Sequence, residues 1–418
     1  MNLQKLVDVR DDEPRAVVMS FLYFFFVLAG YFILRPIRDE VATASGVQKL
    51  PLLFLGTLAV TLIFNPLFSA LVVRFPPRRF IPVAYHFFVL NLLGFYFVMR
   101  FGGTSVWIGR AFFVWTSVFN LFVVSIFWSF MADVFRSDQA KRLFGFIGVG
   151  GTLGSITGSA LTAGLASRIG TVNLLLISAV LLETAVAFVV AFPAMSGGQR
   201  STVRETAGVG GSAFAGITRL LRSRYMLGIC LFLILYTIGS TFLYFQQADI
   251  VGRSFVTREA RTAVLARIEL AVQILTVMTQ VFLTGRLIRW VGLAVALAIL
   301  PALSILGFAG LGIMPVFATL AVFTVLRRGA NFALTNPSME VLFTVVPRED
   351  KYKAKSFIET FVYRGGDQVG AWTYAGLAAL GLGTAGLAFA AIPLAAVWLF
   401  NGLWLGRQHA VRAAEQGS

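Results

Sequence analysis

The feature that most constrains this chain is a succession of long apolar segments, each of about the length that crosses a membrane. A helix needs about 20 mostly apolar residues to cross the hydrocarbon core of a bilayer. We predict such helices near residues 15–35, 50–73, 80–99, 105–132, 141–166, 171–194, 226–247, 263–285, 290–312, 315–346, 356–380 and 384–406. The sequence therefore predicts an all-α polytopic membrane protein with about 12 transmembrane helices.

The composition argues against several other classes of protein. Hydrophobic residues make up 58% of the 418 residues and charged residues only 13%, so the apolar surplus must face lipid. Cys230 is the only cysteine, and His86 and His409 are the only histidines, which argues against a disulfide framework or a histidine or cysteine metal site. The sequence has no GxxxxGK[ST] motif for nucleotide hydrolysis. We expect no enzymatic activity and no cofactor.

Basic residues indicate how the helices are oriented. Loops rich in Lys and Arg stay in the cytoplasm during membrane insertion. The loops on the side of the N-terminus carry about twice as many basic residues as the opposite loops, so we expect both termini to be cytoplasmic. This bias accounts for most of the net charge of +16 without nucleic acid as a partner. We expect a monomer embedded in the lipid bilayer of a bacterial inner membrane.

The longest polar connection divides the predicted helices six and six. We expect an N-terminal six-helix bundle over residues 1–195, a cytoplasmic linker over 196–224 and a C-terminal six-helix bundle over 225–418. This organisation resembles that of major-facilitator transporters, whose two halves are structural repeats. A short similarity between residues 139–151 and 353–366, in the fifth and eleventh helices, supports the division.

Ionisable side chains within the predicted helices are the main candidates for a functional site. A charged side chain in a span costs roughly 2.5–3.5 kcal/mol on insertion scales, and it usually faces a protein interior or a water-filled cavity. In the first helix, Tyr31, Arg35 and Arg38 share one face at spacings of four and three residues. The alternative is that both arginines reach the far interface, where Asp39 or Glu40 neutralises them.

The eighth predicted helix carries a longer polar stripe. Glu269, Gln273, Thr276 and Gln280 follow one another on one face of an otherwise apolar segment. We expect a stripe of this length to line a cavity. Hydrogen bonds between helices, without a substrate, are the alternative.

The tenth predicted helix contains two cations beside an expected kink. Arg327, Arg328 and Asn331 precede Pro337, which cannot donate a helical hydrogen bond. The two arginines point about 100° apart, so we expect only one of them to face a cavity.

The eleventh predicted helix adds Arg364 and Asp367, whose spacing of three residues also allows them to pair with each other. Along the predicted pathway cations outnumber anions: Arg35, Arg38, Arg327, Arg328, Lys355 and Arg364 stand against Asp39, Asp133, Glu269 and Asp367. Because arginine binds phosphate through a planar fork of donors, we expect a small anionic substrate, phosphorylated or carboxylated. The acidic residues are expected to close the gates by pairing with these cations.

Two other features more simply indicate packing. Gly150, Gly154 and Gly158 recur every four residues in the fifth helix and predict a close helix contact. His86 and Glu183 are isolated intramembrane groups. For such groups a hydrogen bond to a neighbour is the commoner role, and proton transfer is the alternative.

Three blocks of the sequence resemble the ATP/ADP antiporters of plastids and intracellular bacteria. They are RPIRD at residues 35–39, FWSFMAD running into DQAKRLF over residues 127–144, and YKAKSFIE at residues 352–359. The resemblance implies a fold similar to that of the major facilitators. It also implies the exchange of cytoplasmic and external nucleotides without hydrolysis.

The resemblance further implies which residues take part in transport. The family's lysine after the first helix matches Arg38, its glutamate at the end of the fourth helix matches Asp133, and its lysine in the third block matches Lys355. Its remaining glutamate matches Glu259 or Glu269, and we prefer Glu269 because it begins the polar stripe. The Arg at 38 and the Asp at 133 preserve the family's charges but change their reach.

These observations predict a secondary transporter that exchanges nucleotides of the ATP/ADP kind, or related phosphorylated anions, by alternating access. We expect the substrate to contact Tyr31, Arg35, Arg38, Glu269, Gln273, Gln280, Arg327, Arg328, Asn331 and Arg364, with Tyr31 stacking on a base. We expect gating or coupling by Asp39, Asp133, Lys355 and Asp367. One alternative is a proton-coupled transporter of another organic anion or an amphiphilic phospholipid. Another is a membrane scaffold that does not transport.

Overall fold

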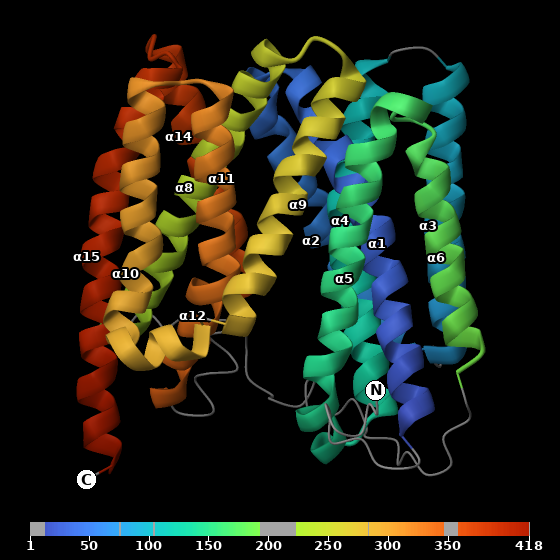
Figure 1. Cartoon of the computed structure of the whole chain (residues 1–418), viewed down its shortest axis with the longest axis horizontal. Helices are drawn as coiled ribbons and strands as arrows, with labels where there is room; N and C mark the ends of the chain where they lie inside the picture. The colour runs from blue at the N-terminus through green and yellow to red at the C-terminus, as the bar shows by residue number, and fades with distance from the viewer. Residues whose placement is uncertain are drawn as a thin grey trace. The chain divides into compact units, whose positions relative to one another are not determined.

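Helices account for all the regular structure in the ranges that the computed structural model describes, which are residues 13–74, 77–102, 105–192, 223–282, 284–346 and 358–417 (Figure 1). Within these ranges the all-α prediction is confirmed. Lys355 and residues 196–222 of the predicted linker lie outside them.

The first half of the chain forms six helices: α1 (Pro14–Ser45), α2 (Leu50–Arg74), α3 (Pro77–Phe101), α4 (Val106–Val134), α5 (Ser137–Ile169) and α6 (Leu174–Val190). The second half forms α8 (Arg224–Ser254), α9 (Arg258–Phe282), α10 (Thr284–Ile313), α11 (Phe317–Ala330), α12 (Asn336–Leu342), α14 (Tyr363–Ala379) and α15 (Thr384–Gly417). Four single-turn elements join them: η2 (Val47–Lys49), η4 (Asn331–Thr335), η5 (Phe343–Val345) and η6 (Ile358–Val362). If α11 and α12 are counted as one interrupted helix, the described residues contain the twelve helices that the sequence predicts.

Nine of these helices are long and apolar enough, within the described ranges, to cross a membrane. The other three are short or irregular. Helix α6 has 17 residues, and α14 follows a π-helical turn, η6. In the tenth predicted helix the π-helical turn η4 directly precedes α12, whose first turn contains Pro337. The sequence predicts a kink there, and the structure shows a local change from α to π geometry.

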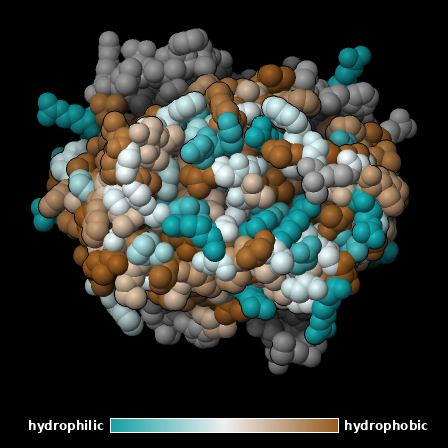
Figure 2. All heavy atoms as spheres, turned by 90° about the horizontal axis from the view of Figure 1, so that it is seen from above, coloured by the Kyte–Doolittle hydropathy of each residue, from teal (hydrophilic) through white to brown (hydrophobic). Residues whose placement is uncertain are grey.

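Large apolar side chains are exposed along the sides of the helices. Val83, Leu90 and Phe400, for example, are 68%, 67% and 70% exposed. Apolar surface of this extent is favourable against lipid and unfavourable against water. Groups of hydrophilic side chains lie on the face at which the helices end, seen from above in Figure 2. The chain is therefore an integral membrane protein.

The chain divides into two units, which are described separately. Unit 1 comprises Met1–Ser45, Gly56–Val209 and Phe255–Leu270, and unit 2 comprises Gly46–Leu55, Gly210–Ser254 and Ala271–Ser418. The first residues of α2 therefore belong to unit 2, and the first residues of α9 belong to unit 1. α2 and α9 are the second helices of the two halves of the chain. Each unit therefore includes the first residues of the other half's second helix.

The same helix pairs pack together in both units. In unit 1, α1 packs against α4, α5 and α6, and α3 packs against α4 and α6. In unit 2, α8 packs against α11, α14 and α15, and α10 packs against α11 and α15. We count α8, α9, α10, α11, α14 and α15 as the first to sixth helices of the second half. The five pairs in unit 2 then join the same helix positions as the five pairs in unit 1. Such a correspondence is expected of a structural repeat.

Glycines allow the first and fifth helices of each unit to approach closely. A Cβ atom at Gly154 of α5 would collide with the backbone oxygen of Phe25 in α1, and one at Gly158 would collide with that of Ala29. The predicted close helix contact is therefore confirmed. In unit 2, a Cβ atom at Gly366 of α14 would collide with the side-chain oxygen of Thr237 in α8.

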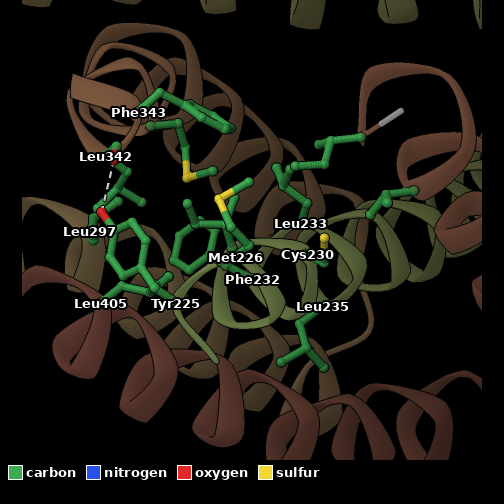
Figure 3. Packing of buried hydrophobic residues seen from close by; sticks show 14 of the residues in the cluster. Tyr225, Met226, Cys230, Phe232, Leu233, Leu235, Leu297, Leu342, Phe343 and Leu405 are labelled. Carbon is green, nitrogen blue, oxygen red and sulfur yellow. Dashed lines mark hydrogen bonds between the residues drawn. The ribbon is translucent and has the colours of Figure 1, made fainter. Parts of the chain in front are cut away.

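The interior of unit 2 contains an apolar cluster that joins α8 to α10, α12 and α15. Tyr225 and Phe232 of α8 lie in this cluster with Leu297, Leu342 and Leu405 (Figure 3). The Tyr225 hydroxyl donates a hydrogen bond of 2.8 Å to the carbonyl oxygen of Leu342. The polar end of this buried ring is thus satisfied, while its apolar body packs in the core.

Candidate functional site

An ion pair in unit 1 joins α1 to the first half of α9. Arg35 Nη1 lies 3.3 Å from Glu269 Oε1, and the Glu269 side chain is only 3% exposed. The Arg35 guanidinium also lies over the Phe32 ring, 5.5 Å from its centroid. Its Nε is buried and has no hydrogen-bond acceptor among the described residues. Because an unpaired buried charge is costly, each partner stabilises the other in this position.

Arg38 lies one turn further along α1 and pairs with the next residue. Its Nε and Nη2 donate to Asp39 Oδ1 at 3.0 and 2.7 Å. Its guanidinium lies 5.5 Å from the centroid of the Phe113 ring in α4. Tyr31 is buried two turns earlier, edge-on to Phe32 at 5.2 Å. The neutralisation of Arg38 by Asp39 is one of the alternatives that the sequence leaves open.

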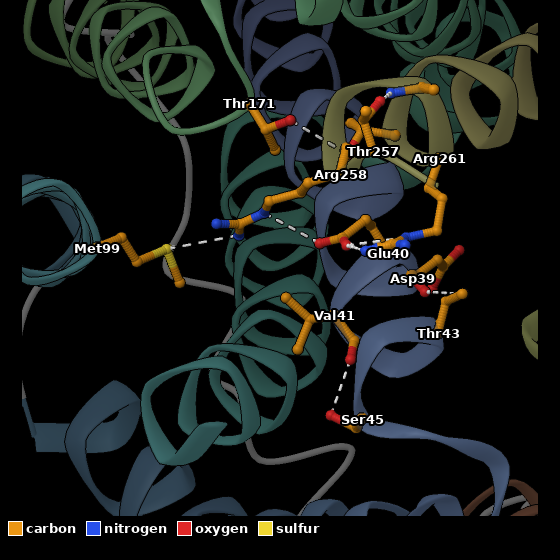
Figure 4. Close-up of polar contacts among 12 residues, drawn as sticks. Asp39, Glu40, Val41, Thr43, Ser45, Met99, Thr171, Thr257, Arg258 and Arg261 are labelled. Atoms are coloured by element: carbon orange, nitrogen blue, oxygen red, sulfur yellow. Dashed lines mark hydrogen bonds and ion pairs between the residues drawn. The ribbon is translucent and has the colours of Figure 1, made fainter. Parts of the chain in front are cut away.

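Glu40 binds two arginines of α9 and is almost fully buried, with 2% of its side chain exposed (Figure 4). Its Oε2 accepts a hydrogen bond of 3.1 Å from Arg258 Nε. Its Oε1 accepts bonds of 2.8 and 3.3 Å from Nη2 and Nε of Arg261. Nearby, the Thr171 hydroxyl donates to that of Thr262 at 3.3 Å. We call Glu40, Arg258 and Arg261 the α1–α9 latch, because they fix the start of α9 to α1.

The two arginines of the latch are absent from the residues predicted to form a site. The available signal is their spacing, since Arg258 and Arg261 are three residues apart and therefore share one face of the first turns of α9. Their partner, Glu40, is more than 200 residues away in the sequence. Helical periodicity relates residues within one helix, so it cannot indicate this pairing.

The polar stripe of α9 becomes less buried along the helix. Glu269, Gln273 and Thr276 are buried, whereas Gln280 is exposed. Gln280 Nε2 donates to the carbonyl oxygen of Phe332 at 3.2 Å, at the π-helical turn η4. Gln280 thus makes the contact between helices that the sequence allows as an alternative to a cavity.

Arg327 lies in the interior of unit 2, with 2% of its surface exposed. Its Nε and Nη1 donate to the hydroxyl oxygens of Ser304 and Ser240, each at 3.0 Å. Its Nη2 donates to the carbonyl oxygen of Tyr236 at 3.2 Å, and its guanidinium lies 5.8 Å from the ring centroid of Trp398. The side chain therefore connects α11 to α8, α10 and α15.

Arg328 is part-exposed, unlike Arg327. We expect Arg328→Gln to lower uptake of an anionic substrate about tenfold or more, because a hydrogen bond to a charged group contributes about 1.5–3 kcal/mol. Arg327→Met is expected to change uptake less than threefold, since a buried cation with neutral partners can be replaced by an apolar chain at little cost. Initial rates with the two purified variants in liposomes measure both effects. The opposite ranking would assign the substrate contact to Arg327.

The remaining predicted residues lie in η4, α14 and α4. Asn331 is buried in η4, and its Oδ1 has no hydrogen-bond partner among the described residues. On α14, Arg364 Nη1 lies 4.0 Å from Asp367 Oδ2, so the two residues do pair with each other. Asp133 is exposed in the last turn of α4, 20 residues after Phe113. That separation corresponds to about 30 Å along a helix, which places Asp133 far from Arg38.

His86 of α3 and Glu183 of α6 bind each other. His86 Nδ1 lies 2.9 Å from Glu183 Oε1, and the two side chains are 52% and 42% exposed. The sequence predicts a hydrogen bond to a neighbour for each of them, which is confirmed. It does not identify the two as partners, because nothing in their spacing indicates that α3 and α6 pack together.

The sequence is similar to ADP,ATP carrier proteins of Chlamydia, whereas no protein-family model matches it. ADP,ATP carrier protein 1 of Chlamydia trachomatis is 22% identical, and the match covers 94% of this chain and 89% of that protein. ADP,ATP carrier protein 2 of Chlamydia pneumoniae is 25% identical, over 47% of this chain and 41% of that protein. This second match thus spans less than half the length of the relative.

The fold is similar to that of solved transporters. The nucleoside transporter NupG matches with a TM-score of 0.59 and 15% identity, covering 96% of this chain and 99% of that one. A POT family transporter, solved in complex with a thioalcohol-conjugated peptide, matches with a TM-score of 0.65 and 10% identity, covering 93% and 95%. At such identities the matches establish the fold alone, which is that of the major-facilitator transporters.

Proposed function

Since this chain is a distant homologue of the ADP,ATP carrier proteins and has the major-facilitator fold, we propose that it is a secondary transporter that exchanges nucleotides, or related phosphorylated anions, across a membrane. The observation that carries the proposal is the match to an ADP,ATP carrier over 94% of the chain. The substrate crosses chemically unchanged, so the protein is a carrier and not an enzyme.

The charges of the proposed site suit a phosphorylated substrate. Arg35, Arg38 and Arg328 bind phosphate oxygens through their guanidinium groups, which form charge-assisted hydrogen bonds. Tyr31 stacks on the base. The rest of the path is lined by Glu269, Gln273, Gln280, Asn331 and Arg364, and gating or coupling falls to Asp39, Asp133, Lys355 and Asp367. The pairing of Arg35 with a buried glutamate supports this assignment, because an anionic substrate can replace that carboxylate.

Both halves of the chain take part in alternating access in this proposal. They correspond to six-helix bundles at 1–195 and 225–418, joined by the cytoplasmic linker 196–224. Both termini lie in the cytoplasm, and the membrane is a bacterial inner membrane, as the distribution of basic residues favours. The transporting unit is a monomer.

Uptake of labelled ADP and ATP by the purified protein in liposomes tests the proposal. We expect uptake only when the liposomes contain nucleotide, because strict exchange requires a counter-substrate. Empty liposomes and liposomes without protein are the controls. Uptake that does not depend on internal nucleotide would contradict exchange, and no uptake by folded protein would contradict the nucleotide substrate.

Proton-coupled transport of another organic anion is the second candidate. The 2.9 Å contact between His86 Nδ1 and Glu183 Oε1 favours it, because an imidazole beside a carboxylate is an arrangement that proton relays use. An imposed pH gradient would then drive uptake without a counter-substrate. His86→Gln would abolish that dependence on the pH gradient.

A further inference from the structure

Two arginines of the α1–α9 latch converge on one carboxylate group. Arg258 and Arg261 together donate three hydrogen bonds of 2.8–3.3 Å to the two oxygens of Glu40 (Figure 4). Guanidinium groups bind the oxygens of carboxylate and phosphate in the same manner. Glu40 therefore occupies a place whose chemistry suits a phosphate group equally well.

The surrounding charges favour an anion at this place. Four arginines and three carboxylates make the ion pairs at the end of α1: Arg35, Arg38, Arg258 and Arg261 with Asp39, Glu40 and Glu269. These seven residues carry a net charge of +1. The two latch arginines also lie in the first turns of α9, where the helix dipole is positive, and Glu259 lies between them in the sequence. If the Glu40 carboxylate leaves, the remaining six residues carry +2, or +1 with Glu259 included, so an anion is favoured in its place.

Arg258 and Arg261 are only partly buried, in contrast to Glu40. Their side chains are 32% and 16% exposed, against 2% for the carboxylate between them. An anion can therefore reach the arginines from solvent, whereas Glu40 approaches them from α1. A phosphate group and the Glu40 carboxylate would therefore compete for the same donors.

We propose that Arg258 and Arg261 form an anion subsite at the start of α9, which the phosphate groups of the substrate and the Glu40 carboxylate occupy alternately. This inference rests on the proposed function, because it takes the substrate to be phosphorylated. When Glu40 occupies the subsite, α9 is tied to α1. When phosphate occupies it, the tie is absent, so substrate binding itself opens the latch.

If the Glu40 carboxylate competes with a phosphate group, substitutions of Glu40 and of Arg261 should change phosphate affinity in opposite directions. Glu40→Gln removes the competitor and is expected to tighten the binding of inorganic pyrophosphate about tenfold. Arg261→Gln removes a ligand and is expected to weaken it at least tenfold. A latch that only stabilised the fold would give changes of the same sign. Pyrophosphate binding to the purified full chain, measured by calorimetry, is the readout.

The matched control is Arg267→Gln, since Arg267 is an exposed arginine on the same helix. We expect it to change pyrophosphate binding less than twofold. If Glu40→Gln does not fold, Glu40→Asp keeps the charge but shortens its reach, so it is also expected to tighten binding. Weaker or unchanged binding in the folded Glu40 variant, or unchanged binding in Arg261→Gln, would overturn the proposal.

Nucleotide uptake in liposomes separates this inference from the proposed function. If the wild-type protein exchanges ADP but the variants show no opposite shifts in pyrophosphate binding, the subsite is wrong and the function stands. If the opposite shifts occur but no nucleotide is taken up, the subsite stands and its phosphorylated ligand is not a nucleotide.

Discussion

Replacement of Arg38 by alanine is expected to lower nucleotide uptake at least about 100-fold while the protein still inserts and folds. The estimate corresponds to about 3 kcal/mol, which is the upper range for a hydrogen bond to a charged group. In the structure Arg38 lies between the Asp39 carboxylate and the Phe113 ring. Its loss removes one of the proposed phosphate ligands, and we expect the backbone of α1 to be unaffected. Initial rates of labelled ADP uptake into preloaded liposomes measure the effect.

Arg38→Lys is the matched control for this prediction. It keeps the positive charge and places there the residue that the ATP/ADP antiporter family has, so we expect it to retain part of the uptake. Normal uptake by Arg38→Ala, from protein present in the membrane in equal amount, would remove Arg38 from the substrate site.

Gly154→Leu is expected to prevent α1 and α5 from packing. A Cβ atom at this position already collides with the backbone oxygen of Phe25, and a backbone atom cannot move aside as a side chain does. Overpacking a core costs about 1–3 kcal/mol where side chains can adjust, so we expect a larger loss of stability here. The measurements are the yield of monodisperse protein and the midpoint of thermal unfolding.

Gly164→Leu provides the comparison on the same helix. Among the described residues, apart from its chain neighbours and its own helix backbone, no heavy atom lies within 4 Å of a Cβ atom built at Gly164, and the residue is exposed. We expect wild-type yield and a midpoint within a few degrees. Equal behaviour of the two variants would show that α1 and α5 do not depend on this close contact.

The helices could be predicted from the sequence because a bilayer imposes a minimum length of apolar chain on each of them. The same periodicity placed Arg35, Glu269 and Arg327 inside the protein, and all three are buried or nearly so. The π-helical turns before Pro337 and Tyr363 could not be predicted, because they depend on how neighbouring helices pack.

Partners from distant parts of the chain could not be predicted either. Spacing identifies which residues of one helix share a face, and it says nothing about the helix opposite. The sequence therefore predicts Arg35 and Glu269 as separate site residues but not their contact. It does not predict Arg258 and Arg261 as site residues. The roles of Asp133 and Lys355 stay predictions.

The division of α9 between the two units gives this helix a mechanical property. It is one continuous helix, with its first turns in unit 1 and its last turns in unit 2. Arg261 binds Glu40 near one end, and Gln280 binds the π-helical turn near the other, about 30 Å away along a helix. The backbone hydrogen bonds of α9 continue without a break between these two contacts, so the helix holds them at a fixed separation.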